Sequence, residues 1–107
     1  MTPEQRESRI KKLVSSARAL LSLQVGLAVG ANRIINELTW LGPEFKDSHP
    51  AFRQFINSIP ASVPLGSARL EWNPESLLKT DQVLAKAEEQ YREAVLRECI
   101  EIIRKYG

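Results

Sequence analysis

Prolines and a glycine interrupt residues 59–74, and this segment constrains the fold more than any other part of the chain. Proline lacks a backbone donor and clashes with the preceding turn, so no continuous helix can cross the segment. The segment still holds Leu65, Leu70 and Trp72, a density of apolar side chains that is rare in a solvated linker. We therefore expect an ordered connector between two helical halves, docked by Leu70 and Trp72.

The part before the connector predicts two helices or one bent helix. Residues 2–5 form a capping box with proline at the first helical position, and apolar residues then recur at three- and four-residue steps. This periodicity loses phase at residues 22–24, where either a turn or a kink is expected. Gly42 and Pro43 should end the second stretch, because glycine suits the residue after the last turn and proline cannot continue a helix.

Gly26 and Gly30 are four residues apart and lie on one face of this second stretch. They remove side-chain bulk, so we expect another helix to approach closely there. The surrounding run is too polar to insert into a bilayer, which favours packing within the fold over membrane association.

The part after the connector predicts a long amphipathic helix. Asn73 and Pro74 form a cap-then-proline start, and neither proline nor glycine follows until after Tyr106. Thr80 could cap a new helix, so a break at that point is an alternative.

Residues 44–58 concentrate aromatic side chains, namely Phe45, Phe52 and Phe55. The sequence Ser48-His49-Pro50 can cap a short helix that runs to about Asn57. We expect a wedge or lid that could also carry part of the functional surface.

Together these elements predict an all-α protein: a small antiparallel helical bundle in which two amino-terminal helices pack on the long carboxy-terminal helix. No segment has a strand partner. With 107 residues, 43% hydrophobic and 26% charged, the chain has the size and composition of one globular domain over residues 1–107. No signal peptide and no run of roughly 18 to 20 apolar residues is present, so a cytoplasmic protein is expected.

The net charge of +2 creates no overall field that favours nucleic acid or an anionic membrane. Residues 1–33 nevertheless hold six cations and two anions, which places a basic face along residues 6–18. This helix has no aromatic residue, and binding of single strands relies on aromatic side chains between the cations. We therefore expect a solvated basic face, with no nucleic-acid partner and no membrane partner; the oligomeric state is left open.

The chain offers little catalytic chemistry. Its single cysteine, Cys99, falls on the apolar stripe of the long helix and is expected to be an inert core residue. Its single histidine, His49, precedes a proline and is expected in a turn or at the surface. The counts exclude the common Cys/His zinc sets, and no phosphate-binding loop or nucleophile elbow occurs. We expect no enzyme, no catalytic residue, no metal and no cofactor.

The sequence predicts one ion pair between the connector and the long helix. Glu88 lies on or beside the inner stripe of the long helix, where a carboxylate needs a partner. Arg69 is the natural candidate, because its planar guanidinium can donate two hydrogen bonds to a carboxylate. The alternative is that Arg69 binds a small anionic ligand.

The segment 64–72 matches a Pro-x-Gly-x-x-Arg-x-x-Trp pattern, which is followed by an Asp and by Glu-x-x-Tyr ahead of a Cys. This pattern resembles a family of small uncharacterised helical bacterial proteins, which are similar to immunity proteins of contact-dependent growth inhibition systems. The resemblance implies stoichiometric neutralisation of a cognate toxin domain, of the nuclease class, by protein–protein contact.

Two sets of residues follow from this resemblance. The motif residues, which are expected to hold the fold, are Pro64, Gly66, Arg69, Trp72, Asp81, Glu88 and Tyr91. The residues expected to contact the toxin are the acidic Glu71, Glu75, Glu89 and Glu93. The alternative function is a helical regulatory or accessory module that binds a small anionic ligand through Arg69, and an enzyme ranks third.

Overall fold

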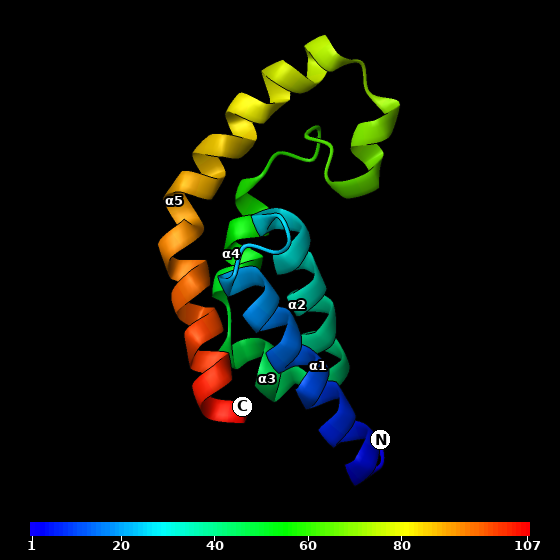
Figure 1. Cartoon of the computed structure of the whole chain (residues 1–107), viewed down its shortest axis with the longest axis vertical. Coiled ribbons are helices and arrows are strands. Elements are labelled where there is room, and N and C mark those ends of the chain that lie inside the picture. The colour runs from blue at the N-terminus through cyan, green and yellow to red at the C-terminus, as the bar shows by residue number, and fades with distance from the viewer.

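The computed structural model describes the whole chain, Met1–Gly107, and contains helices and no strands. The elements in chain order are α1 (Pro3–Leu21), α2 (Leu27–Leu41), α3 (Pro43–Ser48), α4 (Ala51–Ser58), the 3₁₀-helix η1 (Gly66–Glu71) and α5 (Pro74–Tyr106). Figure 1 shows α1, α2, α4 and the carboxy-terminal part of α5 side by side, with α3 at the lower end. The all-α prediction is therefore confirmed.

The amino-terminal half forms two separate helices. The capping box at the start of α1 is present: Thr2 Oγ1 accepts a hydrogen bond from the Gln5 amide at 3.1 Å, and Gln5 Oε1 accepts one from the Thr2 amide at 3.0 Å. Residues 22–26 then turn the chain, and Leu23 adopts a left-handed φ of 59°. The turn separates α1 from α2, so the prediction of two helices is confirmed and the alternative of one bent helix is wrong.

Helix α2 ends as predicted, at Gly42 with a φ of 115°. The segment that follows differs from the expected single helix, because it forms both α3 and α4. The hydroxyl of Ser48 donates to the Glu44 carbonyl at 2.7 Å and so closes α3 rather than capping α4.

Helix α5 is continuous over 33 residues. Asn73 caps its start, since its side-chain oxygen accepts a hydrogen bond from the Ser76 amide at 2.8 Å. The Thr80 hydroxyl donates to the carbonyls of Ser76 and Leu77, both at 3.2 Å, which satisfies it inside the helix. The predicted alternative of a break at Thr80 is therefore wrong.

The core combines side chains from α1, α2, α4 and α5. Its largest fully buried members are Phe52, Phe55, Leu13, Leu20, Ile34, Leu38 and Ile102. Helix α1 packs against both α2 and α5, whereas α4 fills the other space between α2 and α5. Both amino-terminal helices contact α5, as expected, but α2 does so less extensively than α1. Phe45 is buried, like Phe52 and Phe55, so the predicted aromatic wedge packs inside the fold and does not form a surface.

The two glycines of α2 have different surroundings. A Cβ atom added at Gly30 would lie 2.7 Å from Leu20 Cδ1, so the absence of a side chain there admits Leu20 from α1. At Gly26 a Cβ atom would meet nothing within 4 Å. The predicted close approach of another helix backbone is wrong for Gly26, and at Gly30 side chains and not a backbone fill the space. No helix of the structure combines the length and the apolar character needed to cross a membrane.

Candidate functional site

Residues 66–86 form an arm that rises from one end of the bundle. The arm comprises η1, the turn after it and the first part of α5, and none of its residues is buried. Burial is found on either side of it, at Val63 and Pro64 before the arm and at Ala87 after it. Figure 1 shows the arm as an arch above the packed helices, and it lengthens the molecule to 48 × 26 × 24 Å.

A bidentate ion pair closes this arch. Arg69 Nη1 lies 2.6 Å from Asp81 Oδ1, and Arg69 Nη2 lies 3.0 Å from Asp81 Oδ2. The hydrogen bonds from the guanidinium lower the pKa of Asp81, and the same bonds raise the pKa of Arg69. Both side chains are partly exposed, so this pair orders the arm without forming part of the core.

The predicted partner of Arg69 was therefore wrong. Glu88 lies seven residues beyond Asp81, which is about 10 Å further along a helix. Helix η1 brings Arg69 to the level of Asp81 instead, and the charge of Glu88 raises the pKa of Arg69 less than Asp81 does. The sequence identified the arginine and its bidentate bonding to a carboxylate, but not Asp81 as the partner.

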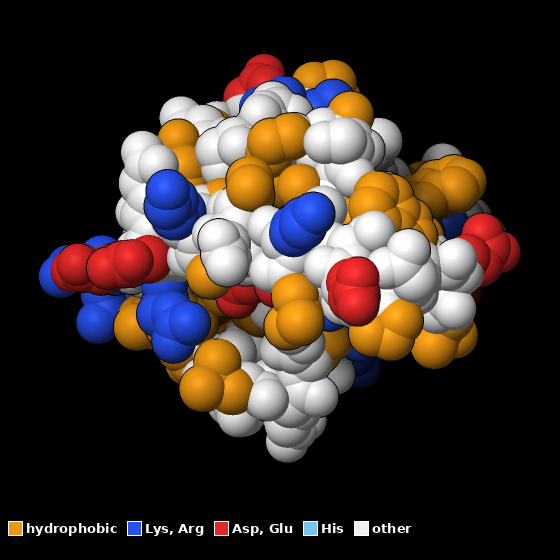
Figure 2. Space-filling model, turned by 90° about the horizontal axis from the view of Figure 1, so that it is seen from above, with side chains coloured by type: hydrophobic (Ala, Val, Ile, Leu, Met, Phe, Trp, Pro, Cys, Tyr) orange, Lys and Arg blue, Asp and Glu red, His pale blue; other side chains and the backbone are white.

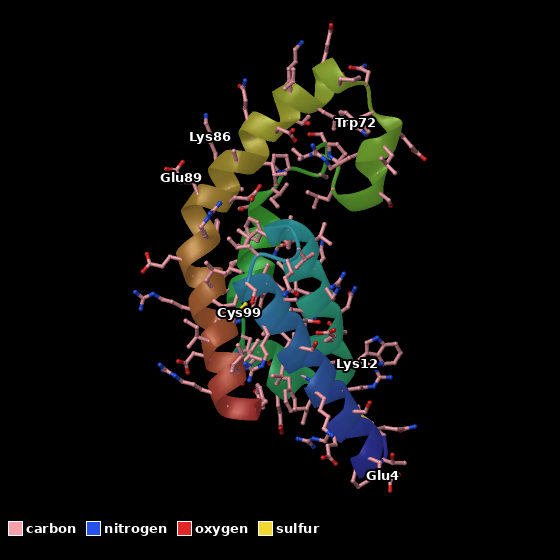
Figure 3. The ribbon with its side chains drawn as sticks, in the orientation of Figure 1. Glu4, Lys12, Trp72, Lys86, Glu89 and Cys99 are labelled. Atoms are coloured by element: carbon pink, nitrogen blue, oxygen red, sulfur yellow. The ribbon has the colours of Figure 1, made fainter.

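The predicted docking of the connector is wrong for Leu70. Leu70 is 88% exposed and Trp72 is 39% exposed. Figure 3 shows Trp72 at the inner side of the arch. The connector is instead anchored by Val63 and Pro64, which are buried at its base.

The arm presents a mixed apolar and charged surface. Leu78 is 69% exposed. The exposed large apolar side chains of the arm are Leu70, Trp72, Leu78 and Val83. Figure 2 looks onto this end of the molecule, and apolar side chains lie there in small groups between charged side chains of both signs. Such a surface suits contact with another macromolecule better than enclosure of a small one.

The four acidic residues expected to contact a toxin are all exposed, but they are not gathered at one point. Glu71 and Glu75 belong to the arm. Glu75, Glu89 and Glu93 lie on one side of α5, because their spacings of 14 and four residues are close to whole helical turns. Figure 3 shows Glu89 and Lys86 directed away from the bundle. Glu93 is held by Arg97 at 2.7 Å.

A cleft of about 320 Å³ separates the arm from the start of α2. Its walls include the first turn of α2, Leu65 and Gly66 of the connector, and Leu84 of α5. Arg69, Asp81 and Glu88 also line it, so one guanidinium faces two carboxylates there. This charge balance gives little support to a small anionic ligand bound by Arg69, because the cation is already paired.

The other motif residues serve the fold in recognisable ways. Gly66 has a φ of 57°, a backbone conformation that favours glycine, and it begins η1. Tyr91 packs against Phe55 with ring centroids 6.1 Å apart. Pro64 is buried at the base of the arm.

A buried polar cluster around His49 was not predicted. His49 lies in the turn between α3 and α4, as one of the two alternatives expected, but it is 3% exposed, so the alternative of a surface position is wrong. Its Nε2 lies 3.0 Å from the Tyr106 hydroxyl, and its Nδ1 lies 3.2 Å from Glu98 Oε2. The cluster joins the α3–α4 turn to the end of α5. The spacing of Glu98 and Tyr106, eight residues apart on one side of a helix, was visible in the sequence. The contact of His49 with both of them was not.

Cys99 is buried in the core, as predicted. Burial raises the pKa of its thiol to about 12, with a smaller contribution from the nearby Glu98 carboxylate, so the nucleophilic thiolate is disfavoured. No cluster of three or more His, Cys, Asp or Glu side chains is arranged to hold a metal ion.

Comparison of the chain with protein-family models, with curated proteins and with solved structures finds no match.

Proposed function

We propose that this chain is a binding protein that neutralises a cognate bacterial toxin domain by direct contact, as an immunity protein does. The observation that carries the proposal is the arm: 21 consecutive residues, 66–86, that are ordered and yet contain no buried side chain. The resemblance of the segment 64–72 to immunity-type proteins supplies the class of partner.

The exposed apolar residues of the arm support a protein partner. Isolated apolar side chains are common on protein surfaces, but the arm exposes two leucines, by 88% and 69%, within 21 residues, and a protein partner would remove this apolar surface from water. Protein interfaces draw most of their affinity from a few such side chains that become fully desolvated. Leu70 and Leu78 are the proposed anchors.

The charges around these anchors support recognition of a basic partner. Residues 66–89 contain five acidic and three basic side chains, including the expected contacts Glu71, Glu75 and Glu89. Nuclease domains are basic where they hold a phosphate backbone, and complementary charge speeds association and selects the partner. The Arg69–Asp81 pair contributes by keeping the arm in one conformation before binding, which reduces the entropy lost on association.

The test is rescue from growth arrest. The carboxy-terminal domain of the protein encoded by the preceding gene is expressed in a bacterial host together with this chain. The proposal expects growth arrest by that domain alone, recovery with the wild-type chain, and loss of recovery with the double variant Leu70→Asp, Leu78→Asp. Purified proteins should form a complex of equal stoichiometry in size-exclusion chromatography.

A matched control separates binding from folding. Ile100 lies on α5 outside the arm and is 38% exposed, so Ile100→Asp introduces the same side chain at a less exposed place. This variant should rescue growth as the wild type does, and all variants should show the same helical circular dichroism. Absence of toxicity from the neighbouring domain, or full rescue by the double arm variant, would reject the proposal.

A further inference from the structure

A second exposed surface lies at the other end of the molecule, where the end of α2 meets the basic face of α1. Trp40 of α2 is 64% exposed there, and the guanidinium carbon of Arg9 lies 4.5 Å from its ring centroid. The fold thus places an aromatic ring beside the basic helix face that has none in its own sequence. Figure 1 shows that this end of α2 is opposite to the arm.

The surface is a shallow depression of about 390 Å³. It is lined by Met1, Gln5, Ser8, Arg9, Lys12 and Trp40. Figure 3 shows Lys12 on the side of α1 that faces away from α5. Two cations, two neutral polar side chains and an exposed indole therefore border the same space.

The cations of this surface are free of ion pairs. Arg9, Lys12 and the nearby Arg33 have no carboxylate oxygen within 4.0 Å. The one carboxylate between them, Glu37, is tied into the α1–α2 contact by the Ser16 hydroxyl, which donates to its Oε1 at 2.7 Å. Burial raises the pKa of Glu37, while Ser16 and the charges of Arg33 and Lys12 lower it by smaller amounts. The outward charge of the surface is therefore positive.

We propose that this surface binds single-stranded nucleic acid through Trp40, Arg9 and Lys12 of the depression and through Arg33, which lies outside the depression on α2. The Arg9 guanidinium lies over one face of the indole, so a base would stack on the opposite face of the ring. The three cations would hold the phosphates on either side of the stacked base. Gln5 and Ser8 provide hydrogen-bonding groups at the edge of the depression.

The composition of the surface favours a nucleic acid over an acidic protein. A protein interface is built around an apolar centre that becomes dry, and this depression offers only Met1 and Trp40 as apolar residues. Interfaces with nucleic acids are more polar and more positively charged, which is the character of this face. A duplex would keep its bases stacked inside and leave the indole unused, so a single strand fits better. This inference goes beyond the proposed toxin binding and does not depend on it.

The first experiment uses Trp40 as its own reporter. The chain contains two tryptophans, and Trp72→Phe leaves Trp40 as the only one. Titration with single-stranded oligothymidylate should quench its fluorescence in a saturable manner. Three phosphate contacts correspond to a salt slope of about −2, so affinity should fall about 20-fold between about 50 mM and about 200 mM salt.

The second experiment measures anisotropy of a labelled oligothymidylate with variants that keep Trp40. The double variant Arg9→Gln, Lys12→Gln should bind weakly, with a slope of about −0.7 for the single remaining contact. The control Lys79→Gln, Lys86→Gln removes the same charge from the arm and should bind as the wild type does. Trp40→Leu should lose affinity without losing the salt slope.

Three outcomes would overturn the proposal. They are no quenching at about 50 mM salt, where electrostatic binding is strong; equal weakening by the arm control; and binding of polyglutamate as tight as that of the oligonucleotide. The last result would assign the surface to an acidic protein segment instead.

Discussion

The two parts of helix α5 differ in burial. After Ala87, its inner side carries Val95, Cys99 and Ile102, all of which are fully buried against the bundle. Before Ala87, no residue of the same helix is buried. Apolar residues recur at helical spacing throughout, so periodicity alone predicts the helix and does not say what covers its apolar side.

This difference separates stability from recognition. The packed part is held by side chains that touch several helices, whereas the arm is held by a cap, by its own backbone hydrogen bonds and by the Arg69–Asp81 pair. Changes in the packed part should therefore lower the free energy of unfolding, and changes in the arm should act on binding. The predictions below test this division, starting with the largest expected effect.

Phe52→Ala should destabilise the protein by about 3–5 kcal/mol, because the ring is fully buried and its loss leaves a cavity. Leu78→Ala, in the arm, should change the free energy of unfolding by less than about 0.5 kcal/mol, since the leucine is exposed. Urea unfolding followed by circular dichroism measures both. Comparable losses in the two variants would show that the arm belongs to the cooperative core.

His49→Leu should have an intermediate effect. It leaves the Tyr106 hydroxyl and the Glu98 carboxylate without their buried partner, which costs about 1–3 kcal/mol. Tyr106→Phe removes one hydroxyl and keeps His49 beside Glu98, so it should cost about 1 kcal/mol. The same urea titration compares them. A His49→Leu variant as stable as the wild type would mean that the cluster only fills space.

The fold was largely predictable from the sequence because its helices carry strong local signals. The capping box at Thr2, the stop at Gly42 and the cap at Asn73 each act within a few residues, and each is found where predicted. The predictions that failed depend on contacts between segments that are distant in the sequence. His49 and Tyr106 are 57 residues apart in the sequence, and no local pattern predicts that they meet.

The candidate site was predictable in part for the same reason. The connector and Arg69 were identified, but the choice between Asp81 and Glu88 depends on how far η1 reaches along α5. The exposure of Leu70 depends on where the bundle ends, which is a property of the whole packing. Trp40 escaped attention because its relation to the basic face of α1 exists only after α1 and α2 pack together.

The Arg69–Asp81 pair should give the smallest effect, and a local one. Arg69→Met should speed amide hydrogen exchange in residues 74–84 and leave the urea midpoint nearly unchanged. Glu88→Gln should change neither the exchange rates nor the midpoint. The pair lowers the pKa of Asp81, so its contribution is present above the ordinary aspartate pKa and is lost as the pH falls through the lower value of the folded state. Protection factors of the arm, measured against those of the residues after Ala87, should therefore hold at mildly acidic pH and decline only below it. A decline shared by the core amides at the same pH, or a fall in the urea midpoint with Arg69→Met, would show that the arm unfolds together with the bundle.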